Sequence, residues 1–428
     1  MEKLYLTANI FNDIAAIILF GSGIYFTVRF DFFQFKGLGQ IFSKTIGSLL
    51  SKNSDKNSFM LFCSSLAGAA GVGNITGVST AILMGGPGAV FWMWVAAFLG
   101  MATKYAETQL AVKNNVKKHG YNSAPMKYIS KASKANIMPF LFAFFGVLVS
   151  LMMGNVVQSR AVCDAIYQSI SITDRTSGPV ICLIITVIIF GGIKRIGQIT
   201  ERTVPIMTLL YGILCTAVII SNTENLLQAF QNIFIYAFKP MAATGGFIGS
   251  AVSNSIRCGV SKGIFSNEAG LGSAGLAYGG TNDVKPDDQA IWGAFDVFAD
   301  TVIISTFTAL AVLTSGGWHE SKSIVVIFNE TMGKSGSIIG AICITLFAIA
   351  SIIVWEYYGE TCFAYITNGR FTVIFRIIFC SFILIGSTTQ AEILWPLSEI
   401  ANTMMMGINM FGVLKNEILN RKKNSVKK

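Results

Sequence analysis

The stretch LAGAAGVGNITGVSTA (66–81) combines residues that cross a membrane with residues that interrupt a helix. Glycines stand at positions 68, 71, 73 and 77, and each weakens a helix by about 1 kcal/mol relative to alanine. Interrupted backbone frees N–H and C=O groups that lipid cannot satisfy, so it is tolerated at membrane depth only beside a cavity or ligand. Asn74 and Thr76 add polar side chains at the same place. The stretch therefore predicts a discontinuous membrane helix.

A second interrupted stretch, GGFIGSAVSNSIRCGVSKGIFSNEAGLGSAG, occupies 245–275 and contains eight glycines. Paired interruptions in corresponding positions of two halves indicate the binding site of a secondary transporter. The competing interpretation is that the glycines only allow close helix packing, as in GxxxG seams. Polar residues such as Asn254, Asn267 and Glu268 stand among these glycines. They favour the transporter interpretation, because unsatisfied polar groups are costly in a dry seam.

The composition of the 428 residues is that of a membrane protein, with 53% hydrophobic and 13% charged residues. Soluble domains carry about 25% charged residues, so a soluble enzyme is excluded. The eight cysteines form no CxxC pair and only two histidines are present, which argues against zinc, iron–sulfur and haem sites. The net charge of +10 is confined to short gaps between apolar runs. We therefore expect no nucleic-acid partner, because such a partner requires a basic face on a folded domain.

Long apolar runs define the expected membrane spans, each near the roughly 20 residues that cross a bilayer. With an outside N-terminus, the inner segments, among them 104–136, carry 23 Lys and Arg residues and the outer segments carry five. Because positive loops stay on the cytoplasmic side, we expect a multi-pass plasma-membrane protein with an outside N-terminus and a cytoplasmic C-terminus. The eleven expected spans are 7–28, 58–84, 87–111, 137–169, 178–193, 203–220, 241–279, 289–315, 336–365, 371–388 and 396–418.

The spans divide into one extra helix and two sets of five, because each set begins with an interrupted segment. We therefore expect an all-α polytopic protein with eleven transmembrane helices, two of them discontinuous. The apolar residues of 222–240 recur at helical spacing, which predicts an amphipathic helix at the outer interface. The expected parts are 1–57 (extra helix and cytoplasmic linker), 58–221 (first repeat), 222–240, 241–419 (second repeat) and 420–428 (basic cytoplasmic tail).

Long motifs in the chain resemble the alanine or glycine:cation symporter family. They include GVGNITGVSTAILMGGPGAVFWMWVAAFLGMATKYAETQLAVK (71–113), GIFSNEAGLGSA (263–274), FADT (298–301) and WEYYGE (355–360). The resemblance implies a sodium-coupled importer of small neutral amino acids such as alanine and glycine. It also implies the LeuT-type five-plus-five inverted repeat with one extra N-terminal helix. The expected partners are an amino-acid substrate, the coupling ion Na+ and the lipid bilayer, and we expect a functional monomer.

A zwitterionic substrate needs donors for its carboxylate and acceptors for its ammonium group. The N–H groups of Val72 and Gly73 are expected to face the carboxylate, at the positive end of the following half-helix. Two aromatic residues, Phe265 and Trp355, are candidates for the wall around the side chain. The remaining expected substrate-binding residues are Asn74, Thr76, Gly77, Gln158 and Ser266.

Similarity to LeuT-type proteins implies two sodium sites, built from the oxygen ligands that a hard cation prefers. The first would use the Ala69 carbonyl, the Asn74 side chain and the Ser266 hydroxyl, with Asp300 or Thr301. The second would use the carbonyls of Ala67, Ala70 and Phe347 and the Ser351 hydroxyl. Two hydroxyl positions common in relatives are alanines here, Ala69 and Ala350. The sodium stoichiometry therefore stays open.

Six acids fall at the expected membrane depth, where a carboxylate is a functional hypothesis by default. Asp300 could balance a cation. Glu268 is expected either to pair with Arg257 or Lys262 or to act in transport. Two rival functions remain: proton-coupled symport through Asp300 or Asp296 and, more remotely, an intramembrane hydrolase using Asp296, Asp300 or Glu268. The remaining acids are Asp164, Glu399 and Glu356, and the sequence offers no account of Glu356.

Overall fold

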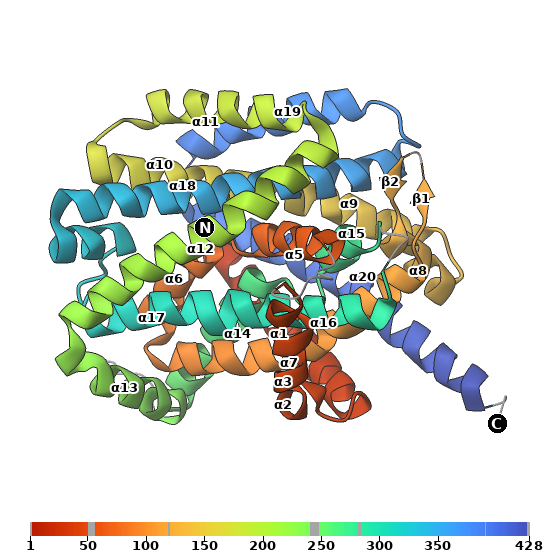
Figure 1. Ribbon diagram of the computed structural model, residues 1–428, viewed down its shortest axis with the longest axis horizontal. Coiled ribbons are helices and arrows are strands. Elements are labelled where there is room, and N and C mark those ends of the chain that lie inside the picture. Colours follow the sequence, from red (N-terminus) through yellow and green to blue (C-terminus); the bar gives the residue numbers. More distant parts are fainter. Residues whose placement is uncertain are drawn as a thin grey trace.

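Helices make up nearly all of the computed structural model, and the long ones run side by side (Figure 1). The structure describes residues 2–49, 56–118, 120–239, 248–280, 284–389 and 391–425. The start of the expected span 241–279, the segment 281–283 and the end of the basic tail lie outside the described residues.

The helices of the first half follow the expected spans closely. Their bounds are α1 (Glu2–Arg29), α2 (Phe33–Lys36), α3 (Leu38–Lys44), α4 (Ile46–Leu49), α5 (Lys56–Ala69), η1 (Val72–Asn74), α6 (Thr76–Gly85), α7 (Gly88–Lys113), α8 (Ala124–Ser133), α9 (Ile137–Leu151), η2 (Met152–Val157), α10 (Gln158–Ile170), α11 (Asp174–Ile189) and α12 (Gly192–Ser221).

The second half of the chain is also helical and begins with a short 3₁₀ turn and the helix α13. Its elements are η3 (Thr223–Asn225), α13 (Leu226–Phe238), α14 (Ile248–Asn267), α15 (Ser273–Tyr278), α16 (Pro286–Val297), η4 (Phe298–Ile304), α17 (Ser305–Thr314), α18 (Ile324–Ile366), α19 (Thr372–Thr388) and α20 (Ala391–Ser425). Gly333 interrupts α18, because its φ of 66° bends the chain between the short helical stretch 324–332 and the long helix that follows.

Six helical stretches in the described chain are long and apolar enough to cross a membrane. They are Lys3–Arg29, Gly88–Lys113, Ile137–Ile170, Arg195–Ser221, Pro286–Thr314 and Ile324–Ile366. The other expected spans coincide with shorter or interrupted helices or, at 396–418, with the 35-residue helix α20, so the sequence located helical segments beyond these six stretches.

Two helices are interrupted in the middle, as the glycine clusters predict. Between α5 and α6, Gly71 is extended (φ −95°, ψ −152°) and a single 3₁₀ turn, η1, follows. Between α14 and α15, Glu268, Gly270 and Gly272 have φ of 56°, 84° and 102°. Glycine reaches this left-handed region without the Cβ clash that other residues meet. We call these segments the first break (70–75) and the second break (268–272).

Gly259 and Gly263 do not interrupt α14, so in the described part of the expected stretch 245–275 the helix is interrupted only after Asn267. A Cβ on Gly259 would lie 2.3 Å from the Ala89 carbonyl oxygen, and one on Gly263 would lie 3.2 Å from Ala96 Cβ. These two glycines therefore let α14 approach α7 closely, which is the packing interpretation.

The segment 104–136 contains more structure than a loop. Lys117–Lys118 (β1) and Tyr121–Asn122 (β2) form a short antiparallel hairpin, in which Lys117 opposes Asn122. Helix α8 follows it. The hairpin and α8 lie at one end of the bundle, whereas α13 lies at the other end (Figure 1). Helix α13 buries Ala229, Ile233 and Ala237 and exposes Leu227, as expected of an amphipathic helix.

Candidate functional site

The two breaks meet at one buried side chain of α18. Trp355 donates from Nε1 to the Gly68 carbonyl oxygen at 3.2 Å and to Glu268 Oε1 at 3.0 Å. One turn earlier, Ser351 also donates to the Gly68 carbonyl, at 3.1 Å. The carbonyl that the first break releases is therefore satisfied by side chains, as buried backbone groups must be. Helix α18 thus holds the two interrupted segments together.

Beside this contact lies a fully buried group of four residues, Asn74, Ser266, Asp300 and Thr301, which we call the Asp300 cluster. Asn74 Nδ2 lies 2.6 Å from Asp300 Oδ1, and Ser266 Oγ lies 2.6 Å from Asp300 Oδ2. Thr301 Oγ1 approaches Asp300 Oδ2 at 2.9 Å. The cluster joins η1, the end of α14 and the π-helix η4, and π-helical turns are frequent at functional sites.

The Asp300 cluster holds more acceptor oxygens than hydroxyl protons. Ser266 Oγ also lies 2.9 Å from Asn74 Oδ1, so its single proton cannot serve both oxygens that flank it. Carboxylate, amide and hydroxyl oxygens are the ligands that hard cations select. The present oxygen–oxygen distances are those of hydrogen bonds, so a bound cation would replace the hydroxyl protons between these oxygens.

Gln158 is brought to the first break, where it contacts the backbone. The Val72 N–H donates to Gln158 Oε1 at 2.9 Å. A Cβ on Gly71 would lie 2.6 Å from Gln158 Nε2, so the amide rests against bare glycine backbone. The N–H predicted to face the substrate carboxylate is thus paired with a side-chain carbonyl in this structure. Gln158 directly follows the π-helix η2.

The other expected substrate residues surround the same break. Thr76 donates to the Val72 carbonyl at 2.9 Å. No atom lies within 4 Å of a Cβ built on Gly77, so space remains beside it. Phe265 is buried, and its Cδ1 would lie 3.2 Å from a Cβ on Gly73. Trp355 is fully buried between the breaks.

The residues expected for a second cation site lie around the Gly68 carbonyl. Ala67 and Ala70 are buried on either side of it, and Phe347 is buried one turn before Ser351 on α18. The Ala69 carbonyl, expected in the first site, accepts from the Gly71 N–H at 2.8 Å. Of the second expected set, the Ser351 hydroxyl contacts the backbone beside the first break directly.

Glu268 does not pair with Arg257 or Lys262, so that prediction is wrong. Lys262 Nζ lies 2.5 Å from Glu399 Oε1 and 4.4 Å from the centre of the Trp395 ring. Arg257 forms two contacts, of 2.7 and 2.9 Å, with Asp13 of α1. Both cations precede the second break on α14 and point towards α1 and α20, whereas Glu268 is the first residue of the break.

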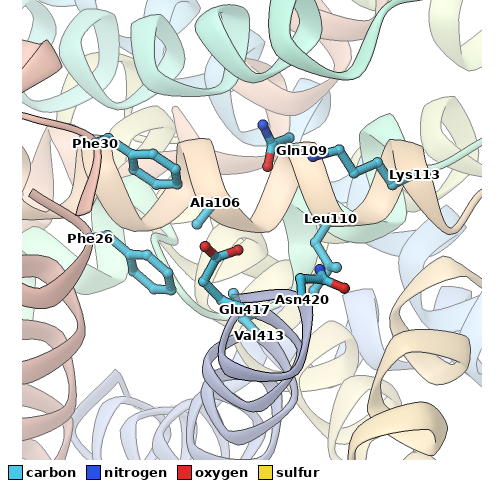
Figure 2. A pocket seen from close by; sticks show the side chains of 9 residues that line it. All are labelled: Phe26, Phe30, Ala106, Gln109, Leu110, Lys113, Val413, Glu417 and Asn420. Atoms are coloured by element: carbon cyan, nitrogen blue, oxygen red, sulfur yellow. The ribbon is translucent and has the colours of Figure 1, made fainter. Parts of the chain in front are cut away.

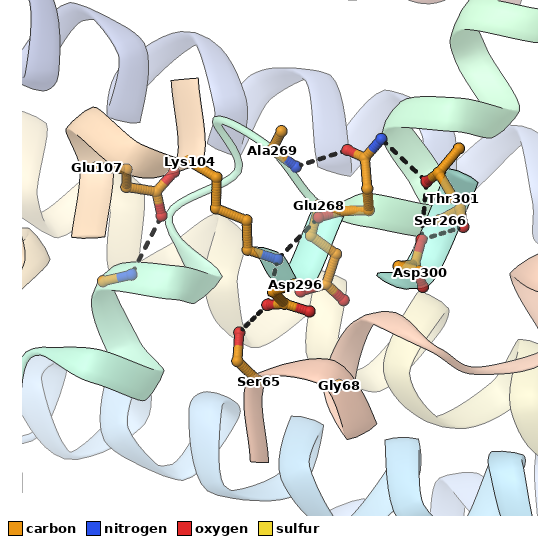
Figure 3. Close-up of polar contacts among 12 residues, drawn as sticks. Ser65, Gly68, Lys104, Glu107, Ser266, Glu268, Ala269, Asp296, Asp300 and Thr301 are labelled. Atoms are coloured by element: carbon orange, nitrogen blue, oxygen red, sulfur yellow. Dashed lines mark hydrogen bonds and ion pairs between the residues drawn. The ribbon is translucent and has the colours of Figure 1, made fainter. Parts of the chain in front are cut away.

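An ion pair between Lys104 and Asp296 lies in the core (Figure 3). The Lys104 ammonium lies 2.8 Å from Asp296 Oδ2 and donates to the Asn267 carbonyl at 2.9 Å. Ser65 also donates to Asp296 Oδ2, at 2.5 Å. Both members of the pair are fully buried. Lys104 is therefore not a loop cation, as the loop-charge count had assumed, but a part of the site.

The signal for Lys104 was present in the sequence. A lysine at the fully apolar depth of the run 87–111 requires a buried anion, and the candidate acids were already identified. Lys104 donates a hydrogen bond to the end of α14, because the carbonyl that accepts it belongs to Asn267, the last residue of that helix. Asn267 also donates from Nδ2 to Thr301 Oγ1 at 3.3 Å. The Lys104–Asp296 pair thus contacts Asn267, the residue that follows Ser266 of the Asp300 cluster.

A cavity of about 410 Å³ leads to the first break from the hairpin end of the bundle. Val354 Cγ1 and the Tyr358 hydroxyl, which border it, would lie 3.1 and 3.4 Å from a Cβ on Gly68. The other lining residues are Met60, Leu61, Ser64, Lys117, Gly120, Asn122, Ile196, Gly197, Gln198, Ala277, Gly280 and Tyr357.

Two smaller hollows carry no comparable site. The cleft between α1, α7 and α20 has about 10 Å³ and is bordered by Phe26, Lys113 and Glu417 (Figure 2). The second, of about 20 Å³, lies beside Phe265 and Glu399. Each has room for about one water molecule. Only the 410 Å³ cavity, among these three, could admit an amino acid.

Comparison with known proteins identifies the family. The model of the sodium:alanine symporter family matches residues 4–424. The chain belongs to this family. It is 34% identical to the sodium/alanine symporter AgcS of Methanococcus maripaludis, with 93% of this chain and 90% of that protein covered. It is 36% identical to an uncharacterized transporter of Haemophilus influenzae, over 93% of this chain and 89% of the other.

The sodium:alanine symporter family member also shares its fold with solved transporters. The crystal structure of MhsT in complex with L-phenylalanine matches with a TM-score of 0.61 and 12% identity, over 83% of this chain and 87% of that one. The protein is thus a multi-pass membrane transporter and not an enzyme. The intramembrane hydrolase is excluded as a function. Asp296 and Asp300 instead have separate partners, Lys104 and Asn74.

Proposed function

We propose that this protein is a sodium-coupled symporter that imports small neutral amino acids, with alanine and glycine as the expected substrates. The observation that carries the proposal is the Asp300 cluster, in which Asn74 of the first break and Ser266, two residues before the second break, both donate to one buried carboxylate. A carboxylate in this position is costly without a counter-ion. A monovalent cation would supply that charge and draw the two breaks together at the same time.

The substrate carboxylate would bind the N–H groups of Val72 and Gly73, with Gln158 moving aside to release the first of them. The ammonium group would then face the carbonyls freed by the breaks. Phe265 lies against Gly73, so it would limit the size of the side chain. Asn74, Thr76, Gly77, Ser266 and Trp355 complete the proposed substrate shell.

Two sodium sites are proposed around this substrate. The first uses the Asp300 cluster with the Ala69 carbonyl. The second uses the carbonyls of Ala67, Ala70 and Phe347 with the Ser351 hydroxyl, which now donates to the Gly68 carbonyl. Ser351 supplies the single hydroxyl of the second site. The affinity of the second site for sodium would therefore be lower than that of the first site.

Transport would proceed by alternating access within eleven spans arranged as an inverted five-plus-five repeat after α1. The loop charges favour an outside N-terminus, which makes the hairpin end of the bundle cytoplasmic. On that assignment, the 410 Å³ cavity opens inwards. On the same assignment, the Lys262–Glu399 pair and the tilted rings of Phe265 and Trp395, whose centres are 4.7 Å apart, would close the outer side. The protein would work as a monomer in the plasma membrane.

The test is uptake of labelled alanine by liposomes that contain the purified protein. We expect uptake under an inward sodium gradient and none under a proton gradient alone. Uptake driven by protons in the absence of sodium would overturn sodium coupling and favour the proton-coupled rival. A panel of small and large neutral amino acids as competitors then tests the substrate class. Stronger competition by large side chains than by alanine would overturn it.

A further inference from the structure

A second buried acidic group begins at the residue after Trp355 on α18 but faces Arg376 of α19, and the proposed function does not use it. Glu356 and Glu360 stand one helical turn apart, and both side chains are almost completely buried. They share a single guanidinium, that of Arg376 on α19. Two carboxylates against one guanidinium leave one negative charge uncompensated in the core.

Arg376 is fully engaged by one of these acids. Its Nε lies 2.9 Å from Glu360 Oε2 and its second nitrogen lies 2.9 Å from Glu360 Oε1. This is the bidentate geometry of a strong arginine–carboxylate pair. The Tyr121 hydroxyl of the hairpin donates to the same Glu360 oxygen at 2.5 Å. Glu360 is therefore a satisfied carboxylate.

Glu356 is left without a counter-ion at hydrogen-bond distance. Its Oε1 lies 3.9 Å from Arg376 Nε, beyond the range of a hydrogen bond. In the described part of the chain no donor reaches this oxygen. Glu356 and Glu360 both approach Arg376, so their carboxyl groups lie on the same side of α18. Two carboxyl groups can form a hydrogen bond with each other only when a proton lies between them.

The surroundings of Glu356 offer no other charge to balance it. The titratable groups that act on it in the described chain are Glu360 on its own helix and Arg376 and Cys380 on α19. Tyr121 acts on it only through Glu360. A neutral cysteine cannot stabilise an anion as a cation would. Protonation is thus the one neutralisation that these groups allow.

We propose that Glu356 and Glu360 hold one proton between them, forming a proton-binding site separate from the Asp300 cluster. The proton belongs mainly to Glu356, because Arg376 and Tyr121 stabilise Glu360 as the carboxylate. Tyr121 is half-buried on the hairpin and provides the route by which the site exchanges protons with the solution.

The proposal of this proton-binding site does not depend on the proposed function, and its test does not require a transport measurement. The purified protein in lipid nanodiscs is measured by infrared spectroscopy at neutral pH. The Glu356→Gln variant is expected to lose one carboxylic acid C=O band that the wild type shows. Glu330→Gln, which changes an acid paired with Lys322 near the surface, is expected to keep it. An unchanged band in Glu356→Gln would overturn the proposal.

A second measurement follows the melting temperature against pH. A proton bound in the folded state but released on unfolding makes stability fall as pH rises. The wild type is expected to lose stability between neutral and alkaline pH more steeply than Glu356→Gln, whose amide is neutral throughout. Equal slopes would overturn the proposal. If Glu356→Gln does not fold, the wild type is titrated to alkaline pH and its infrared spectrum is followed instead. The carboxylic acid C=O band is expected to disappear during this titration. A band that persists would contradict the proposal.

Discussion

Trp355 donates a hydrogen bond to Glu268 at 3.0 Å, deep between the two interrupted helices. The same indole N–H also reaches the Gly68 carbonyl of the first break. One side chain of α18 therefore touches the unwound segments of both halves. The geometry links the position of α18 to the shape of both breaks.

Replacing Trp355 by Phe should loosen both breaks. The change removes the indole donor from Glu268 Oε1, at about 1–3 kcal/mol for a buried group that loses its hydrogen bond, whereas the Gly68 carbonyl keeps the hydrogen bond from Ser351. We expect a lower melting temperature and a fall in the maximal rate of uptake. Trp94→Phe is the matched control, because Trp94 donates to Thr306 away from the breaks. A Trp355→Phe variant that behaves like this control would show that the contact has no role in transport.

Asn74→Ala should raise the sodium concentration needed for half-maximal uptake severalfold. The substitution removes an amide oxygen and an amide donor from the Asp300 cluster. Thr80→Ala serves as the control, since Thr80 lies on the following half-helix and donates only to the Thr76 carbonyl. Uptake is measured against sodium at saturating alanine. An unchanged sodium dependence would show that Asn74 is not a ligand.

Gly73→Val should block substrate binding without unfolding the protein. The new side chain would push against Phe265, whose ring atom lies 3.2 Å from the position of Cβ, and would fill the space expected for the substrate. Gly21→Ala on α1, where no atom lies within 4 Å of Cβ, controls for the loss of a glycine. Binding of alanine is measured by thermal shift in sodium. Retained alanine binding would show that the substrate does not approach the backbone there.

Lys104→Met should lower the stability of the folded protein more than most substitutions in the core. Breaking a buried ion pair by removing one partner costs about 3–5 kcal/mol, because the other charge remains buried. The double variant Lys104→Met with Asp296→Asn should recover much of the melting temperature. Lys44→Met, which breaks an exposed pair with Asp288, should cost at most about 1 kcal/mol. A double variant no more stable than Lys104→Met would contradict this account of the pair.

The sequence located the helices and both breaks because these depend on local chemistry. Apolar runs form spans, and glycines at 71, 270 and 272 permit backbone that a helix cannot contain. The sequence alone did not distinguish these glycines from Gly259 and Gly263, which allow α14 to pack closely against α7. A glycine has the same local effect in both settings, so the distinction depends on which helix lies opposite.

The partners of the buried charges were the part that the sequence could not assign. Pairing with Lys262 or Arg257, one of the two roles expected for Glu268, does not occur, because those cations face Glu399 and Asp13. Lys104 was taken for a loop residue although it pairs with Asp296. Residues more than a hundred positions apart become partners only when their helices pack.

By itself, the sequence determined that this is a helical membrane protein with two interrupted helices and polar residues at both interruptions. Hydropathy and glycine content act within a few residues, so they can be read along the chain. Only the tertiary structure decided that Trp355 bridges the breaks, that Gln158 pairs with the Val72 N–H and that one guanidinium serves two acids on α18. These contacts depend on the rotation and spacing of whole helices, which no local pattern encodes.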